Sequence, residues 1–113
     1  MSRVFLSHSS RDTREAVAVK AWLVEQEPDV ARAAARIVDV HAYLVHALTG
    51  EWATSLASAD PMGIVEMRRG AWATDLIQDI GLHEEQFVPI VAPGAVVGEI
   101  TPEAATATGL RAM

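Results

Sequence analysis

Two groups of polar residues in this chain have the types and the spacing to suggest chemistry. The run Ser7-His8-Ser9-Ser10 places hydroxyl groups beside an imidazole, the combination of nucleophile and base that acyl-transfer enzymes use. Neighbouring residues on a strand point to opposite sides, however, and no third residue that would orient the histidine can be identified. A structural loop is therefore the favoured interpretation of this run.

The second group is the histidine pair His41 and His46, which suggests a metal site only at first sight. Five positions separate the two residues, so a helix would place them on different faces. The chain has no cysteine, which excludes disulfides, thiolate nucleophiles and cysteine-based zinc sites. The sequence predicts no metal site and no catalytic residue, and it favours a core or interface role for His41.

Charge and hydropathy narrow the classes of partner. The net charge is −6, and residues 34–113 account for all of it, with four basic and ten acidic side chains. Nucleic-acid binding needs clustered Lys and Arg, so we expect no nucleic-acid partner. No apolar run approaches the roughly 20 residues of a membrane span, and no secretory signal is recognisable. We expect a cytoplasmic protein that does not contact membranes.

The first part of the chain reads as a strand followed by a helix. Residues 3–7 contain the continuous apolar run Val4-Phe5-Leu6, which is typical of a buried strand. Asp12 and Glu15 have the spacing of a capping box, so a helix should begin there. Such a unit is the first half of a β-α-β motif, but no second strand is recognisable after Glu27-Pro28-Asp29.

The longest periodic pattern predicts a helix from Val30 to Leu48. Its apolar residues recur at steps of three and four, and Gly50 stands where a helix C-cap belongs. Turn-forming residues dominate from Glu51 to Met67, so we expect a loop there, with one short strand at residues 64–67. Ser58 and Asp60 lie in this loop, where turn formation is the favoured role of Asp60.

Shorter elements are expected in the last third. Thr74 should cap a short helix that ends at Gly81, and Thr101-Pro102 should open a last helix that Gly109 ends. Between them we expect a turn at residues 83–86 and two β-rich stretches, residues 87–91 and 96–100.

From Tyr43 onward the chain resembles the N-terminal domain of the FGGY family of carbohydrate kinases, and the likeness extends over about residues 31–113. The matching residues follow the family's order: Tyr43-Leu44, Leu48-Thr49-Gly50-Glu51, Ala53-Thr54, Ser58-Ala59-Asp60, Trp72, Leu76 to Leu82, Val88-Pro89, Val97 to Thr101, Ala104-Ala105 and Thr108-Gly109-Leu110. Three residues depart from the family pattern: Ala42 and Ser55 stand where Asp is common, and Ser58 where Asn is common.

The resemblance implies a ribonuclease-H-like (actin-type) parent fold and ATP- and magnesium-dependent phosphorylation of a sugar or polyol hydroxyl. It also implies that Ser58 and Asp60 are the residues to place near a sugar. The family's first phosphate-binding hairpin, its adenosine site and its catalytic Asp have no counterpart in this sequence. We therefore expect no cofactor in this chain and no kinase activity from it alone.

The first residues, about 2–27, resemble instead the start of a bacterial TIR domain. Val4 to Asp12 matches its first strand and loop, and Lys20-Ala21-Trp22-Leu23 continues the likeness along the first helix. TIR enzymes that cleave NAD use a glutamate on a later helix, beyond this stretch, so no glutamate of this chain is assigned to that role.

Together these patterns predict a helix-rich α/β fragment without a complete sheet. It would comprise a TIR-like strand-helix segment, residues 1–29, and a partial kinase N-terminal domain, residues 30–113. The leading hypothesis for its function is an inactive remnant of a carbohydrate kinase. The alternatives are a truncated TIR-type signalling or NAD-hydrolysing module and a non-catalytic interaction fragment. The last would bind itself or a partner protein through exposed apolar helix faces such as Ile37-Leu44-Leu48.

Overall fold

The computed structural model describes residues 13–112. The predicted strand at residues 3–7 and the run Ser7-His8-Ser9-Ser10 lie outside this range. The first described element is the helix α1, Thr13–Gln26, which confirms the prediction of a helix that begins near Asp12.

The single long helix predicted from Val30 to Leu48 is wrong. The structure has a short helix α2, Pro28–Ala33, then an extended stretch, and then α3, Val40–Thr49. Asp39 is the N-cap of α3: its Oδ1 accepts a hydrogen bond of 2.7 Å from the Ala42 N–H. Gly50 ends α3 in the left-handed conformation with φ 78°, as predicted.

The physical reason for the break is a side chain far away in the sequence. The Gln86 side-chain amide donates to the carbonyls of Ala31 and Ala34, at 2.8 and 3.0 Å. The backbone carbonyl of Gln86 in turn accepts a hydrogen bond from the Ile37 N–H at 2.6 Å. The first two bonds satisfy carbonyl groups at the end of α2, and the third holds the extended stretch that follows, so the apolar period is interrupted.

The rest of the described chain consists of short elements. In chain order these are β1 Thr54–Ser55, α4 Leu56–Ala59, the 3-10 turn η2 Asp60–Met62, β2 Val65–Glu66, β3 Ala71–Trp72, α5 Thr74–Asp79, the 3-10 turn η3 Glu84–Gln86, β4 Ile90–Val91 and α6 Pro102–Thr108. The stretch predicted as a loop, residues 51–67, therefore holds helical turns as well as the expected strand. The β-rich stretch 96–100 forms no strand. The N-cap of α5 is Ala73 rather than Thr74.

The strands form two small pairs. β1 runs parallel to β4, with Thr54 opposite Ile90 and Ser55 opposite Val91. β2 pairs antiparallel with β3. The fold is thus helix-rich α/β, and its described part holds only two-stranded sheets.

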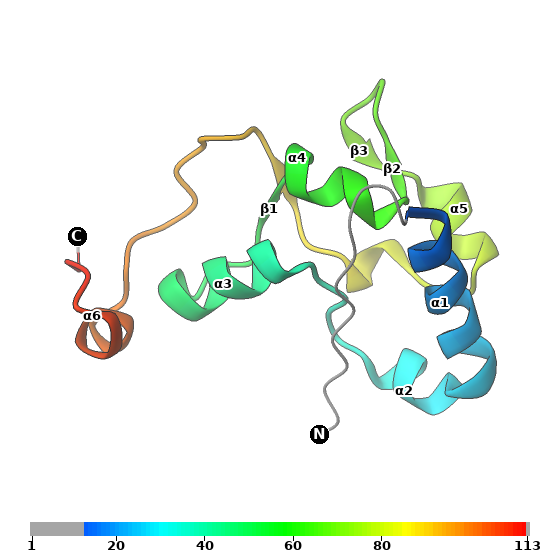
Figure 1. The fold of residues 1–113 in the computed structure, drawn as a ribbon, viewed down its shortest axis with the longest axis horizontal. Helices are drawn as coiled ribbons and strands as arrows, with labels where there is room; N and C mark the ends of the chain where they lie inside the picture. The colour runs from blue at the N-terminus through cyan, green and yellow to red at the C-terminus, as the bar shows by residue number, and fades with distance from the viewer. Residues whose placement is uncertain (1–12, 113) are drawn as a thin grey trace.

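The apolar core lies between α1, the helical run α4–η2, the β2–β3 pair and α5 (Figure 1). Ile64 and Ile77 are completely buried at its centre. The indole of Trp72 donates to the Val88 carbonyl at 2.9 Å, and its ring lies 5.0 Å from that of Phe87. The largest buried apolar side chains of the described part thus lie on one side of the molecule.

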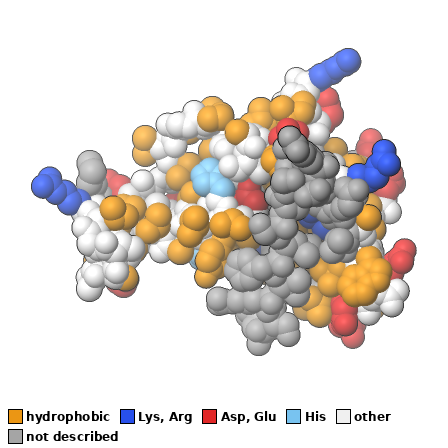
Figure 2. All heavy atoms as spheres, in the orientation of Figure 1, with side chains coloured by type: hydrophobic (Ala, Val, Ile, Leu, Met, Phe, Trp, Pro, Cys, Tyr) orange, Lys and Arg blue, Asp and Glu red, His pale blue; other side chains and the backbone are white. Residues whose placement is uncertain are grey.

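On the other side, α3, the extended segment 92–100 and α6 form an arm-like extension (Figure 1). The Thr101 hydroxyl caps α6 by accepting from the Ala104 N–H, and Gly109 ends the helix with φ 78°, as the sequence predicts. Hydrophobic side chains gather at the surface over α3 (Figure 2), where Val40 and Leu44 are about half exposed. Within residues 13–112, every helix is too short or too polar to cross a membrane.

Candidate functional site

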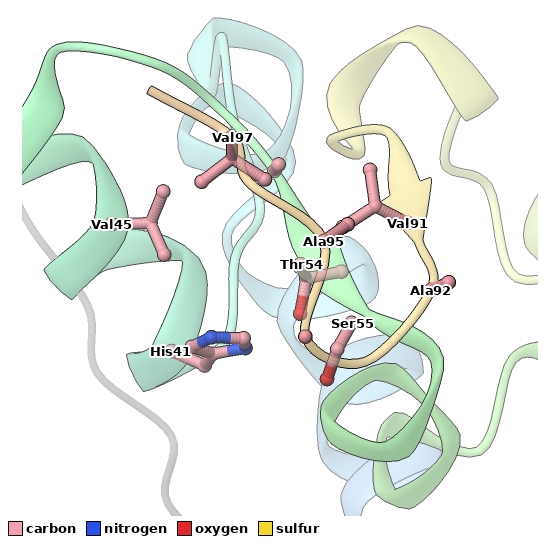
Figure 3. A pocket seen from close by; sticks show the side chains of 10 residues that line it. His41, Val45, Thr54, Ser55, Val91, Ala92, Ala95 and Val97 are labelled. Carbon is pink, nitrogen blue, oxygen red and sulfur yellow. The ribbon is translucent and has the colours of Figure 1, made fainter. Parts of the chain in front are cut away.

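A half-open pocket of about 240 Å³ lies between α3, β1 and the segment that follows β4 (Figure 3). It adjoins the carboxyl ends of the parallel strands β1 and β4, the edge at which α/β folds commonly bind ligands. Most of the residues that line it are Ala, Val or Gly, and its polar side chains come from α3 and β1. The residues that line it are His41, Val45, Ala53, Thr54, Ser55, Val91, Ala92, Gly94, Ala95 and Val97.

The two hydroxyl groups of the pocket already have partners within the protein. Thr54 Oγ1 donates to Asp39 Oδ2 at 2.7 Å. Ser55 Oγ donates to Ser58 Oγ and accepts from the Ser58 N–H, both at 3.2 Å. Each hydroxyl thus donates its one proton to another residue of the protein, so it can only accept a hydrogen bond from a ligand.

The pocket does not contain an activated nucleophile. Figure 3 shows the His41 ring on the same side of the pocket as the Thr54 and Ser55 hydroxyls, but no hydrogen bond joins the imidazole to either of them. A general base must lie within hydrogen-bond reach of the proton that it removes. The arrangement therefore suits binding of a small molecule better than covalent chemistry.

The two predicted sugar-contact residues lie on one helical run beside this pocket. Ser58 is half-buried on α4 and meets the pocket indirectly, through Ser55. Asp60 is exposed at the start of η2 and does not line the pocket. Their contact with a sugar stays a prediction.

Sequence reasoning missed the role of Asp39, whose carboxylate joins two elements by capping α3 and bonding Thr54 on β1. The local signal was present, because an Asp directly before an apolar helical run is a typical N-cap. Its second bond, to a residue 15 positions later, had no such signal.

The two histidines of α3 have different surroundings in the structure. His41 is exposed and lines the pocket, so a core role is wrong, while the alternative interface role stays a prediction. His46 stacks on Trp52 with ring centroids 3.7 Å apart and planes 6° from parallel, and its Nδ1 is buried without a hydrogen-bond partner. Among residues 13–112, no three His, Asp or Glu side chains lie close enough together to hold a metal ion.

A second pocket, of about 250 Å³, is bordered by the β2–β3 pair and the start of α5. Its charged groups are Glu66, Arg69 and Asp75. Arg69 Nε pairs with Glu66 Oε2 at 2.9 Å, and the Arg69 side chain is largely exposed. Such exposed pairs contribute little to stability.

Comparison with known proteins relates this geometry to one family. Residues 11–113 match the model of the N-terminal domain of the FGGY family of carbohydrate kinases. The autoinducer-2 kinases of Klebsiella pneumoniae and of an Enterobacter species are each 32% identical to the chain over 80% of its length. The chain spans only 17% of the length of either relative.

Solved structures agree with this match. Xylulose kinase from Rhodospirillum rubrum superimposes with a TM-score of 0.77 and 28% identity, over 86% of this chain and 20% of that protein. Gluconate kinase from Lactobacillus acidophilus has a TM-score of 0.79 at 20% identity, which shows likeness of fold alone. It covers 90% of this chain and 23% of that protein.

The comparisons lend no support to the TIR resemblance. The kinase match already begins at residue 11, so it includes Lys20-Ala21-Trp22-Leu23 on α1, part of the stretch on which that resemblance was based. The other part, Val4 to Asp12, lies outside the described residues. The division of the chain near residue 29 stays a prediction, while α1 packs on α2 and η2.

The chain belongs to the FGGY family of carbohydrate kinases, of whose N-terminal domain it represents a fragment.

Proposed function

We propose that this chain is a remnant of a carbohydrate kinase whose parent reaction is ATP-dependent phosphorylation of a sugar or polyol hydroxyl, and that it has no catalytic activity alone. The observation that supports this proposal most strongly is the family match over residues 11–113, combined with the small share of each relative that the chain spans. The parent fold would be the ribonuclease-H-like, actin-type fold of sugar kinases.

The chemistry of the described residues supports the proposed lack of catalytic activity. Phosphoryl transfer needs a phosphate cradle, a carboxylate that holds magnesium, and a base near the acceptor hydroxyl. The pocket offers one exposed imidazole and two hydroxyls that are already bonded, and the described acidic residues form no metal-binding group. These residues do not fit ATP or magnesium, so both would be held by other parts of an active kinase.

The substrate of the parent reaction would be a small polyhydroxylated molecule. The relatives' names, autoinducer-2 kinase and xylulose kinase, support a sugar-like substrate for this chain's lineage. We place Ser58 and Asp60 near such a sugar, on the run α4–η2. The departures from the family pattern at Ser55 and Ser58 leave the particular sugar open.

An assay of ATP consumption tests the proposed inactivity directly. The purified chain is incubated with ATP, magnesium and either xylulose, ribulose, glycerol or erythritol, and phosphorylated product is measured. The full-length xylulose kinase from Rhodospirillum rubrum serves as the positive control. We expect no turnover above a blank without protein; robust turnover would overturn the proposal.

The exposed apolar face of α3 supports a second candidate, a non-catalytic interaction fragment. Val40 and Leu44 are one helical turn apart on α3 and are 48% and 51% exposed, and hydrophobic side chains gather at the surface over this helix (Figure 2). Contiguous exposed apolar surface commonly marks an interaction site. Sedimentation velocity over a range of concentrations tests this candidate: a protein that remains monomeric throughout would exclude self-association through this face.

A further inference from the structure

Lys20 on α1 is a buried lysine that reaches a distant helical turn. Its Nζ donates to the Met62 carbonyl at 3.4 Å, across 42 positions of sequence. The residue is only 6% exposed, which is rare for lysine unless the amine has a partner. Burial lowers the pKa of the Lys20 amine, because it disfavours the charged form.

The Met62 carbonyl is at a position that attracts a cation. α4 and η2 form one continuous helical run from Leu56 to Met62, which Gly63 ends in the left-handed conformation with φ 78°. The last carbonyls of such a run lack intrahelical donors and carry partial negative charge. An amine donor at this end satisfies one of them, as basic side chains commonly do at helix C-termini.

We infer that Lys20 is a positioning residue that holds the C-terminal end of the α4–η2 run against α1, and thereby fixes Ser58 and Asp60 relative to the core. α1 and η2 are in direct contact, and further along α1 Val24 packs on the same apolar core. Ser58 and Asp60 belong to the same continuous helical run as Met62, so a contact that anchors the end of this run also restrains these two residues. The inference goes beyond the proposed function, because it holds whether or not the chain belongs to an active kinase.

A role of Lys20 as a nucleophile has less support. A depressed pKa is typical of lysines that form Schiff bases, but such a lysine must also be open to a substrate. Lys20 lines neither of the two pockets described above. The geometry therefore favours positioning.

Hydrogen–deuterium exchange of the Lys20→Met variant tests this inference. Methionine retains the apolar stem and removes the donor and the charge. The N–H groups of Asp60 and Gly63, which bond to the carbonyls of Leu56 and Asp60, should lose protection about tenfold or more. Amides of α3 should change less, by about twofold or below.

Two further variants separate positioning from packing and from charge. Arg14→Met removes an exposed positive charge from the same helix and should leave protection unchanged. Lys20→Arg retains charge and donors, so it should recover part of the protection that Lys20→Met loses, which a purely apolar role would not produce. Equal protection at Asp60 and Gly63 in the wild type and Lys20→Met, or an equal loss across all helices, would overturn the inference.

A measurement on the unmodified chain keeps the inference testable if the variants do not fold. NMR should show a nuclear Overhauser effect between the Lys20 ε-protons and the backbone protons of Met62 or Gly63. Well-resolved spectra without this contact would contradict the positioning role.

Discussion

The two sides of the molecule are stabilised in different ways. On the side of α1, α5 and the β2–β3 pair, large apolar side chains such as Ile64, Ile77 and Trp72 are buried together. On the side of α3 and α6, the buried residues of the two helices are Ala42 and Ala104. The first side depends on packing, whereas the second depends on helix caps and single hydrogen bonds.

On the capped side, single hydrogen bonds join α3 to β1 and the start of α6 to the end of α3. Asp39 joins α3 to β1 through Thr54, and the Thr101 N–H donates to the Leu48 carbonyl at 3.0 Å. In the segment 92–100, which leads to α6, Val96 is 92% exposed. Because stability is not uniform across a structure, we expect this side to open at lower free energy than the packed core.

The largest expected effect is the loss of a core side chain. Ile77→Ala removes a completely buried side chain and should lower the free energy of unfolding by about 2–5 kcal/mol. Urea unfolding followed by tryptophan fluorescence measures the change. Leu76→Ala, on the same helix but 37% exposed, is the matched control and should cost less; equal costs would contradict the position of the core.

Removing the Asp39 carboxylate should have the next largest effect. Asp39→Ala loses the cap of α3 and the acceptor of the Thr54 hydroxyl, so we expect a loss of about 1–3 kcal/mol, concentrated on the capped side. Hydrogen exchange localises it to α3 and β1. Asp79→Ala, an exposed residue at the end of α5, should change stability by about 0.5 kcal/mol or less. A uniform loss of exchange protection across both sides would contradict the difference between the packed side and the capped side.

The cap of α6 should matter less, since this helix has few tertiary contacts. Thr101→Ala removes the hydroxyl that accepts from the Ala104 N–H and should cost about 1 kcal/mol of local stability. Exchange of the α6 amides reports it. Thr106→Ala removes a hydroxyl within the same helix that bonds only to the Pro102 carbonyl, and its effect on those amides should be smaller.

The burial of Lys20 predicts a pH dependence of the packed side. Its pKa is lowered in the folded protein, so between that value and the ordinary value of 10.5 the unfolded chain binds more protons than the folded one. The free energy of unfolding should therefore rise with pH in this alkaline window. The charged residues on the neighbouring elements are Asp29 and Arg32 on α2 and Asp60 on η2. Lys20→Met should lack the rise, and an unchanged slope in this variant would contradict the assignment.

The smallest effect is expected at Leu44. The structure places Leu44 on an exposed face of α3, so a charge at this position does not enter the core. Leu44→Asp should thus change the free energy of unfolding by about 0.5 kcal/mol or less. Thermal unfolding checks this prediction. A variant without any folded structure would contradict the exposed position of Leu44 on α3.

Local patterns predicted much of the fold, because their physics lies within a few residues. The Thr101 cap, the proline at the first position of α6 and the final Gly109 all depend on bonds within one or two helical turns. The same holds for Gly50 at the end of α3. The family resemblance likewise came from short motifs in order along the chain, and the comparisons confirm it.

For the candidate site, the sequence indicated Ser58 and Asp60 but not the pocket beside them. That pocket depends on the pairing of β1 with β4, which brings Ser55 next to Val91, and on segment 92–97 crossing over β1 (Figure 3). The sequence predicts the β-rich stretch 87–91 that holds β4, but the two residues of β1 carry too little periodicity to be recognised as its partner strand. The pocket could therefore not be predicted.

By itself, the amino-acid sequence determined the family, the helix caps and the absence of cysteine chemistry, because each depends on residue identity or on neighbours along the chain. Only the tertiary structure decided where the long apolar period breaks, since Gln86 meets the end of α2 from 52 and 55 positions away. It also decided that Lys20 is buried and that Leu44 is exposed. Periodicity shows which residues share a helix face, but what covers that face depends on segments that are distant in the sequence.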